Sequence, residues 1–196
     1  MLFFGTGRLG RNACLGTHWV TYREGSRIEV ILGSTVCPEC RDLVATEVAR
    51  VNDAVQGYFV MTTRQSDVVR PPIEPAIITV VVLPIPELVA DSICGDGALG
   101  ACSHPLFDDG YLEGGETFYP ANENVFDINE IGHLIGLCHV HPEYEPGGTM
   151  AAVGIDRSRA RFSDEEMEAI RRVYSADLPN RASESVFRER GLIPDN

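Results

Sequence analysis

The segment Ala76–Leu83, with the sequence AIITVVVL, places the strongest constraint on the fold. Every residue in it except Thr79 is apolar and most are β-branched, which is typical of a strand buried on both faces. Pro84 and Pro86 end the run. It is the longest apolar stretch of the chain, and it falls far short of the roughly 20 residues that cross a bilayer, so we expect no membrane span.

The elements expected around this strand form a mixed sheet with a helix packed on it. Alternating apolar residues predict a strand or hairpin over His18–Leu32, and a second short strand over Tyr58–Thr63. Between them, valines at helical spacing predict an amphipathic helix over Pro38–Gln56, with Gly57 as its stop signal. The segment Ile85–Pro120 is rich in Gly, Asp and Pro, and we expect loops there with one or two short strands.

Two further helices are expected in the second half of the chain. The first covers Val125–Cys138 and ends near Gly136. The second opens at Ser163, which forms an S-x-x-E capping box with Glu166. Its apolar stripe consists of Met167, Ile170, Val173 and Tyr174.

Length and charge limit the classes of protein that the chain can belong to. At 196 residues it has the size of a single domain, and we expect one domain over residues 1–196. It carries 16 basic and 29 acidic side chains, which gives a net charge of −13. Because a surface this acidic repels phosphate backbones, we expect no nucleic-acid partner.

The cysteines indicate an oxidising compartment. There are six of them, an even number: Cys14, Cys37, Cys40, Cys94, Cys102 and Cys138. Most of them lie in expected loops. This pattern predicts at least two disulfides and a secreted or extracytoplasmic protein whose leader is absent from this chain. Cys94 and Cys102 bracket the tight segment GDGALGA and are the preferred pair. The CPEC segment at Cys37 and Cys40 also fits a redox or zinc half-site, although no second CxxC accompanies it.

An acidic segment, Leu106–Tyr119, offers oxygen ligands for a cation. Its carboxylates are Asp108, Asp109, Glu113 and Glu116. Two interpretations stay open, a Ca²⁺ site and a solvated hairpin, because the spacing of the ligands is unlike that of an EF-hand.

The most specific chemistry lies in Asn129–Met150, NEIGHLIGLCHVHPEYEPGGTM. Residues four apart share a helix face, so the side chains at 129 and 133 point at one spot, with Glu130 next to it. Gly136 permits a sharp turn that brings His139 back as a third ligand. Three ligands and an open position make a catalytic zinc site, in which Glu130 would take a proton from the metal-bound water.

This segment resembles the metzincin signature H-E-x-x-H-x-x-G-x-x-H and is most similar to matrixin-type metalloproteases. The resemblance places Glu130 at the general base and Gly136 at the turn glycine. It places His133 and His139 at two of the zinc-ligand positions. Downstream, Met150 in GGTMAA is similar to the Met-turn that forms a floor under the metal.

The resemblance implies an α+β fold and an activity. The fold is metzincin-like: a twisted mixed β-sheet with a backing helix and an active-site helix, then the Met-turn and a C-terminal helix, which Phe162–Ser175 resembles. Its two subdomains meet near residue 139. The activity is that of a zinc endopeptidase, often secreted, whose protein or peptide substrate lies extended along an edge strand. That strand is expected within Ala98–Tyr119.

The sequence departs from the signature at the first ligand position, which holds Asn129 in place of His. An amide oxygen binds zinc more weakly than an imidazole does. Three explanations stay open: a natural family member whose zinc site has decayed, an engineered or selected variant of a working protease, and a site that recruits another donor such as His141.

Two main functions compete. One is a zinc endopeptidase weakened by Asn129, and the presence of Glu130 favours it because a base has little use without a metal. The other is an inactive pseudo-protease that binds protein or peptide in the former active-site cleft, and the loss of a ligand histidine favours it. A zinc or calcium module without peptidase activity, stabilised by its loops, is a third interpretation.

Overall fold

The structure, a computed structural model, describes residues 21–84, 101–108, 111–121, 126, 128–137, 149–150 and 161–174. The elements in these ranges are β1 (Arg27–Leu32), α1 (Pro38–Val55), β2 (Val60–Gln65), β3 (Ile77–Leu83), β4 (Cys102–Asp108), β5 (Tyr111–Pro120), α3 (Asn129–Leu134) and α4 (Asp164–Val173). No helix in these ranges has the length and apolar character needed to span a membrane.

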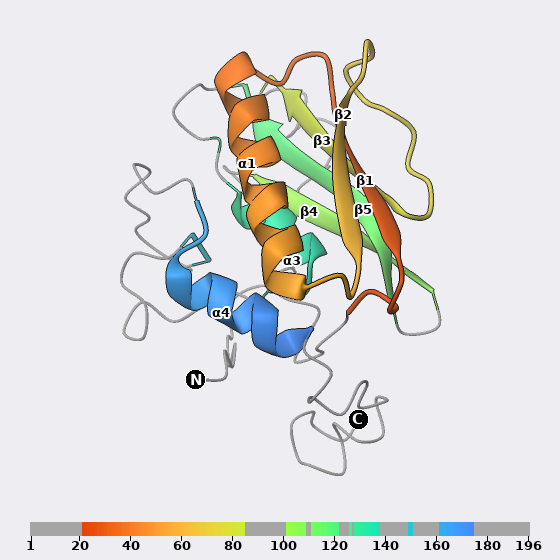
Figure 1. Ribbon diagram of the computed structural model, residues 1–196. Coiled ribbons are helices and arrows are strands. Elements are labelled where there is room, and N and C mark those ends of the chain that lie inside the picture. The colour runs from red at the N-terminus through yellow and green to blue at the C-terminus, as the bar shows by residue number, and fades with distance from the viewer. Residues whose placement is uncertain are drawn as a thin grey trace, which may run out of the picture.

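The strands form one mixed sheet of five strands in the order β2-β1-β3-β5-β4. Strands β2, β1, β3 and β5 run parallel to one another, and β4 pairs antiparallel with β5. Helix α1 lies across the sheet, with α3 and α4 near one end of it (Figure 1). The expected mixed sheet with a packed helix is therefore confirmed, and the chain combines α and β structure as an α+β fold does.

Strand β3 confirms the prediction made from the apolar run. It lies between β1 and β5, and Ile78, Val80 and Val81 are fully buried. Ile78 and Val80 join the large core shared with the helices, whereas Val81 packs with Leu83 and Phe118 in a separate cluster. Because successive side chains of a strand point to opposite faces, both faces of β3 are covered.

Helix α1 begins and ends where the sequence predicts. Cys37 is the N-cap residue and Pro38 occupies the first turn, where its missing N–H costs nothing. The helix stops at Gln56 and Gly57, which have φ angles of 50° and 84°. Its apolar stripe is buried against the sheet, at Val44, Val48, Val51 and Val55.

The hairpin β4–β5 corrects the expectation of mainly loops over Ile85–Pro120. Strand β5 is long and mostly buried, and it pairs with β3 from Gly114 to Pro120. Glycine is usually unfavourable in strands, which is why the segment was expected to be irregular. Here a Cβ atom on Gly114 would lie 2.1 Å from the carbonyl oxygen of Ile77, so glycine is what allows β5 to approach β3.

Other boundaries also differ from the sequence expectation. Of the strand or hairpin expected over His18–Leu32, residues 18–20 lie outside the described ranges, and the described part is a strand only from Arg27, after a turn at Gly25 with a φ of 80°. The helix expected over Val125–Cys138 is limited to the short α3, which starts at Asn129. Residues 122–125, 127 and 138 lie outside the described ranges.

The acidic side chains of the hairpin bind arginines. Asp108 and Glu113 lie 2.8 and 3.6 Å from the guanidinium of Arg23. Glu116, almost completely buried, accepts two hydrogen bonds from Arg70 at 2.8 and 2.9 Å. The charges of the described carboxylates are thus balanced by two different arginines, Arg23 and Arg70, and the carboxylates do not share one site. Asp109 lies outside the described residues, and a Ca²⁺ ion in this segment stays a prediction.

The described cysteines form disulfides. Cys37 and Cys40 are bonded to each other. Cys102 is disulfide-bonded to a cysteine outside the described residues. Cys94, its expected partner, also lies outside them, so the Cys94–Cys102 pair and a secreted location stay predictions.

The capping box of α4 is confirmed and reaches further than expected. The Ser163 hydroxyl accepts from the Glu166 backbone, and Glu166 Oε2 accepts from the Ser163 backbone N–H at 2.7 Å. Glu166 Oε1 also accepts a 2.6 Å hydrogen bond from the Met150 backbone N–H. Met167, Ile170 and Tyr174 are buried as expected, and Val173 is half-buried. One buried carboxylate therefore joins α4 to the turn at residues 149–150.

Removal of this carboxylate should destabilise the domain strongly. Glu166→Ala leaves the backbone N–H groups of Met150 and Ser163 without their acceptor, and we expect a loss of about 3 kcal/mol in the free energy of unfolding. Glu165→Ala, at an exposed position in the same helical turn, is the matched control and should change it by less than about 0.5 kcal/mol. Urea unfolding followed by circular dichroism measures both. Equal effects of the two variants would contradict the role given to Glu166.

Candidate metal and catalytic site

Helix α3 carries the candidate site and is held against the end of the sheet formed by β4 and β5 (Figure 1). Ile131 and Leu134 are buried in the main core. A Cβ atom on Gly115 of β5 would lie 2.9 Å from Leu134 Cδ2, so glycine lets the helix approach the sheet. The helix is short, and these contacts rather than its own hydrogen bonds fix its position.

The backbone turn at Gly136 orients His133. Gly136 has a φ of 91°, and the N–H groups of Gly136 and Leu137 donate to the carbonyls of His133 and Gly132. This is a Schellman ending of the helix. It returns the Leu137 carbonyl to the His133 ring, 2.9 Å from Nδ1. Because a carbonyl only accepts, Nδ1 carries the proton and the lone pair of the neutral ring is on Nε2.

Burial keeps His133 in the neutral form that binds metals. Burial lowers the pKa of its imidazole, and the hydrogen bond to Leu137 opposes that shift only in part. A neutral ring with a fixed Nδ1–H and a basic Nε2 is what a zinc site requires of a histidine ligand. The predicted ligand His133 is therefore suited to that role by its surroundings.

Glu130 lies beside His133 on the buried part of α3. Burial raises the pKa of its carboxyl to about 7, and a hydrogen bond from the Ser103 side chain partly opposes this. Ser103 belongs to β4, the edge strand, so this bond fastens the carboxylate to the sheet edge. A carboxyl group with a pKa near neutrality can both take up and release a proton, as general acid–base catalysis requires.

The amide nitrogen of Asn129 donates a hydrogen bond to the turn at residues 149–150. Nδ2 donates a 2.7 Å hydrogen bond to the Thr149 carbonyl and lies 3.7 Å from Met150 Sδ. The carbonyl of Thr149 can only accept, so the nitrogen is the amide atom that faces it. The side chain that replaces the expected first ligand thus holds the turn that follows the site.

Met150 lies against α3. Its side chain is almost completely buried. A Cβ atom on Gly132 would lie 2.5 Å from Met150 Sδ, so the glycine makes room for the sulfur. The structure therefore brings Asn129, Glu130, His133 and Met150 together, although Met150 is distant in sequence.

The predicted ligand His139 and the alternative donor His141 lie outside the described residues, as does Cys138. Among the described residues no group of three or more His, Cys, Asp or Glu side chains is placed to hold a metal. His133 fits zinc by its donor atom, whereas the amide nitrogen of Asn129 does not. A complete ligand set thus requires donors from outside the described residues, where the predicted ligand His139 lies.

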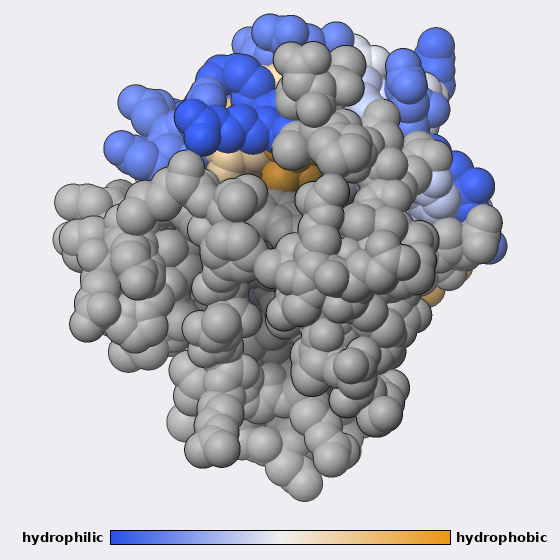
Figure 2. All heavy atoms as spheres, turned by 90° about the horizontal axis from the view of Figure 1, so that it is seen from below, coloured by the Kyte–Doolittle hydropathy of each residue, from blue (hydrophilic) through white to orange (hydrophobic). Residues whose placement is uncertain are grey.

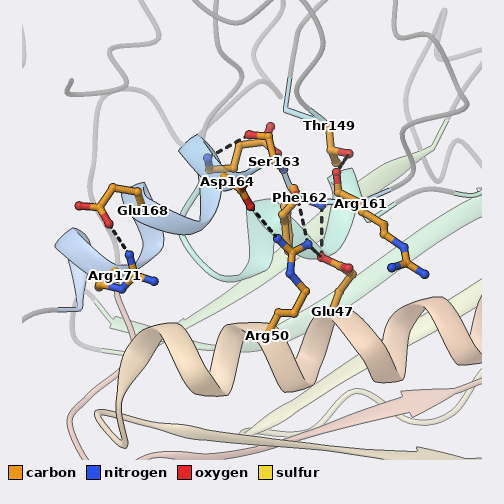
Figure 3. A network of polar contacts seen from close by, with 10 residues as sticks. Glu47, Arg50, Thr149, Arg161, Phe162, Ser163, Asp164, Glu168 and Arg171 are labelled. Carbon is orange, nitrogen blue, oxygen red and sulfur yellow. Dashed lines mark hydrogen bonds and ion pairs between the residues drawn. The ribbon is translucent and has the colours of Figure 1, made fainter.

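A polar network that the sequence did not reveal supports the site from α1 (Figure 3). Glu47 is fully buried, and its Oε2 accepts from Arg50 at 2.8 Å and from the Phe162 backbone N–H at 3.2 Å. The adjacent Arg161 carbonyl accepts from the Thr149 hydroxyl at 2.8 Å. Helix α1 therefore reaches the turn beneath α3 through residues 161 and 162.

One of these supporting residues, Glu47, could have been recognised from the sequence. Glu47 lies on the apolar face of α1, three residues after Val44 and one before Val48, and a carboxylate at such a position signals a buried partner. Ser103 gave no such signal, because its bond to Glu130 depends on how β4 pairs with β5.

No protein-family model and no curated protein matches this sequence.

The raised pKa of Glu130 predicts a specific pH dependence of stability. Between its unfolded pKa of about 4.5 and its folded pKa of about 7, the folded chain holds a proton that the unfolded chain has released. The free energy of unfolding therefore falls as pH rises through this window, by roughly 3 kcal/mol for this group alone. Glu130→Gln removes that fall and should be more stable than the wild type above pH 7.

Urea unfolding at pH 5 and pH 8, in the presence of a chelator, measures this difference. The lowered pKa of His133 has the opposite sign, because its stabilisation is lost as pH falls, but wild type and variant share it. Glu165→Gln, which removes an exposed carboxylate, should leave the wild-type slope unchanged. If the stability of the Glu130→Gln variant changes with pH as that of the wild type does, the pKa of Glu130 is not raised in the folded chain.

Proposed function

We propose that the chain is a zinc-dependent endopeptidase of the metzincin type, weakened by the asparagine at its first ligand position. Glu130 is the general base, and His133 and His139 are the histidine ligands. The observation that supports this most directly is the placement of Glu130 beside β4, one helical turn from an imidazole whose Nε2 carries the lone pair.

The edge strand gives the substrate a place to bind. Strand β4 ends the described sheet, and β5 pairs with one side of it only. An extended peptide would add to the other side by backbone hydrogen bonds. Because Ser103 of β4 bonds Glu130, a peptide on this edge would lie close to the carboxylate. This agrees with the edge strand expected within Ala98–Tyr119.

The roles of the residues follow from their environment. Zinc, when bound, would polarise the scissile carbonyl and lower the pKa of a water molecule. The Glu130 carboxylate would accept the proton of that water and later release it to the departing amine. The Leu137 carbonyl would keep His133 in its ligand tautomer. Met150 would support α3 from below.

A pseudo-protease is the second candidate, and one observation favours it. Asn129 donates its amide nitrogen to the Thr149 carbonyl and so takes part in the turn. A side chain held in this way stabilises the scaffold without contributing an imidazole. In that case the free edge of β4 in the described sheet would bind protein or peptide and leave it uncut.

Restoration of the imidazole should separate these alternatives. Asn129→His places a nitrogen ligand one turn before His133, on the same helix face. We expect zinc affinity to rise at least tenfold, and peptide hydrolysis that a chelator abolishes to appear or increase. Added to this variant, Glu130→Gln should leave zinc bound and lower hydrolysis by about 10²- to 10⁴-fold. Zinc titration and cleavage of a quenched fluorescent peptide library measure these effects.

Asn129→Gln is the matched control, because it keeps the amide and should gain neither zinc affinity nor activity. A wild-type chain that already binds zinc tightly, and gains nothing from histidine, would mean that Asn129, His141 or Glu130 is a ligand. A chain that binds peptides and cuts none, even as Asn129→His with zinc bound, would establish the pseudo-protease.

A further inference from the structure

The disulfide between Cys37 and Cys40 lies at the start of α1, far in sequence from the candidate site. Both cysteines are half-buried, and their neighbours Ser34, Thr35, Pro38 and Glu39 are exposed. A small thiol can therefore approach this bond from solvent.

The two sulfur atoms have different surroundings. Cys37 is the N-cap residue of α1, and its Sγ already accepts a 3.1 Å hydrogen bond from the Cys40 backbone N–H. The side chain of Cys40 packs against the hydrophobic core. Cys37 is thus the sulfur whose negative charge would be stabilised, by a backbone donor and by the helix dipole.

Charged neighbours act in both directions. Arg41 is anchored beside the turn, where its guanidinium donates to the carbonyls of Val36 at 2.8 Å and Ser34 at 3.3 Å. Its positive charge favours a thiolate nearby, while the exposed carboxylate of Glu39 opposes one. The contacts of Arg41 do not involve sulfur, so they can persist when the disulfide opens.

The bond also contributes little to folding. Only two residues separate the cysteines, so the disulfide closes a very short loop and removes little entropy from the unfolded chain. The start of α1 is held independently by Pro38 and by the hydrogen bonds of Arg41. A disulfide that adds little stability, is accessible and releases a stabilised thiolate has the properties of a labile one.

We propose that Cys37–Cys40 is a reversible thiol–disulfide exchange site, which reacts with low-molecular-weight thiols or an accessible protein dithiol. A thiolate attacks Cys37 Sγ, which breaks the Cys37–Cys40 bond and releases the Cys40 thiolate, which takes up a proton. A second thiolate attacks the outer sulfur of the mixed disulfide and releases the Cys37 thiolate. The two thiols are oxidised to one disulfide, and the protein disulfide is reduced to a dithiol.

Equilibration with glutathione buffers tests the proposal on the wild-type chain. After rapid alkylation, mass spectrometry gives the reduced fraction of each cysteine. We expect Cys37 and Cys40 to become half-reduced at a ratio of reduced to oxidised glutathione at least tenfold lower than Cys102 requires. The circular dichroism spectrum should stay native at that point. Reduction together with Cys102, or only with loss of the native spectrum, would overturn the proposal and mark a structural disulfide.

Two single variants test the asymmetry. Cys40→Ser leaves Cys37 as a thiol, and Cys37→Ser leaves Cys40. We expect iodoacetamide to alkylate Cys37 in the first at least tenfold faster than Cys40 in the second at pH 7, with both variants folded. Comparable rates would refute the stabilisation of Cys37 at the N-cap. Neither readout involves zinc or hydrolysis, so the outcome is independent of the proposed peptidase function.

Discussion

The arrangement of the site depends on the buried carboxylate of Glu166. Its two oxygens accept hydrogen bonds from the backbone N–H groups of Met150 and Ser163, so one side chain fixes both the turn beneath α3 and the start of α4. A carboxylate is tolerated at this depth because N–H donors replace the water that it loses. Asn129 holds the same turn from the other side through the Thr149 carbonyl. The turn is thereby fixed between two helices.

Backbone geometry then determines the chemical state of the side chains above this turn. The positive φ of Gly136 directs the Leu137 carbonyl to His133, and that carbonyl selects the tautomer of the ring. Glu130 is controlled differently, by burial and by one hydroxyl from the edge strand. Both groups differ from their behaviour in water because of contacts that their own helix does not supply. The chemistry proposed for α3 is therefore a property of its environment.

The redox site proposed at Cys37 and Cys40 differs from the site on α3, because its properties depend on residues that are neighbours in the sequence. There the cap, the donor and the reacting sulfur all belong to the first turn of α1. Helix α1 also carries Glu47 and Arg50, which bind the backbone N–H and the carbonyl of Phe162. One helix thus has a local function at its start and a supporting function along its length.

The sequence by itself determined the features that depend on a few neighbouring residues. The apolar run predicted β3, the valine spacing and Pro38 predicted α1, and the S-x-x-E pattern predicted the cap of α4, because periodicity and capping are local. The spacing of Asn129, Glu130 and His133 likewise put them on one helix, although that helix is shorter than the expected Val125–Cys138. Only the tertiary structure decided that the glycine-rich segment around Gly114 is a central strand, since this depends on close approach to β3. It alone showed that Ser103 binds Glu130 and that Asn129 binds Thr149, because such contacts arise from strand register and helix packing, which join residues that no local pattern connects.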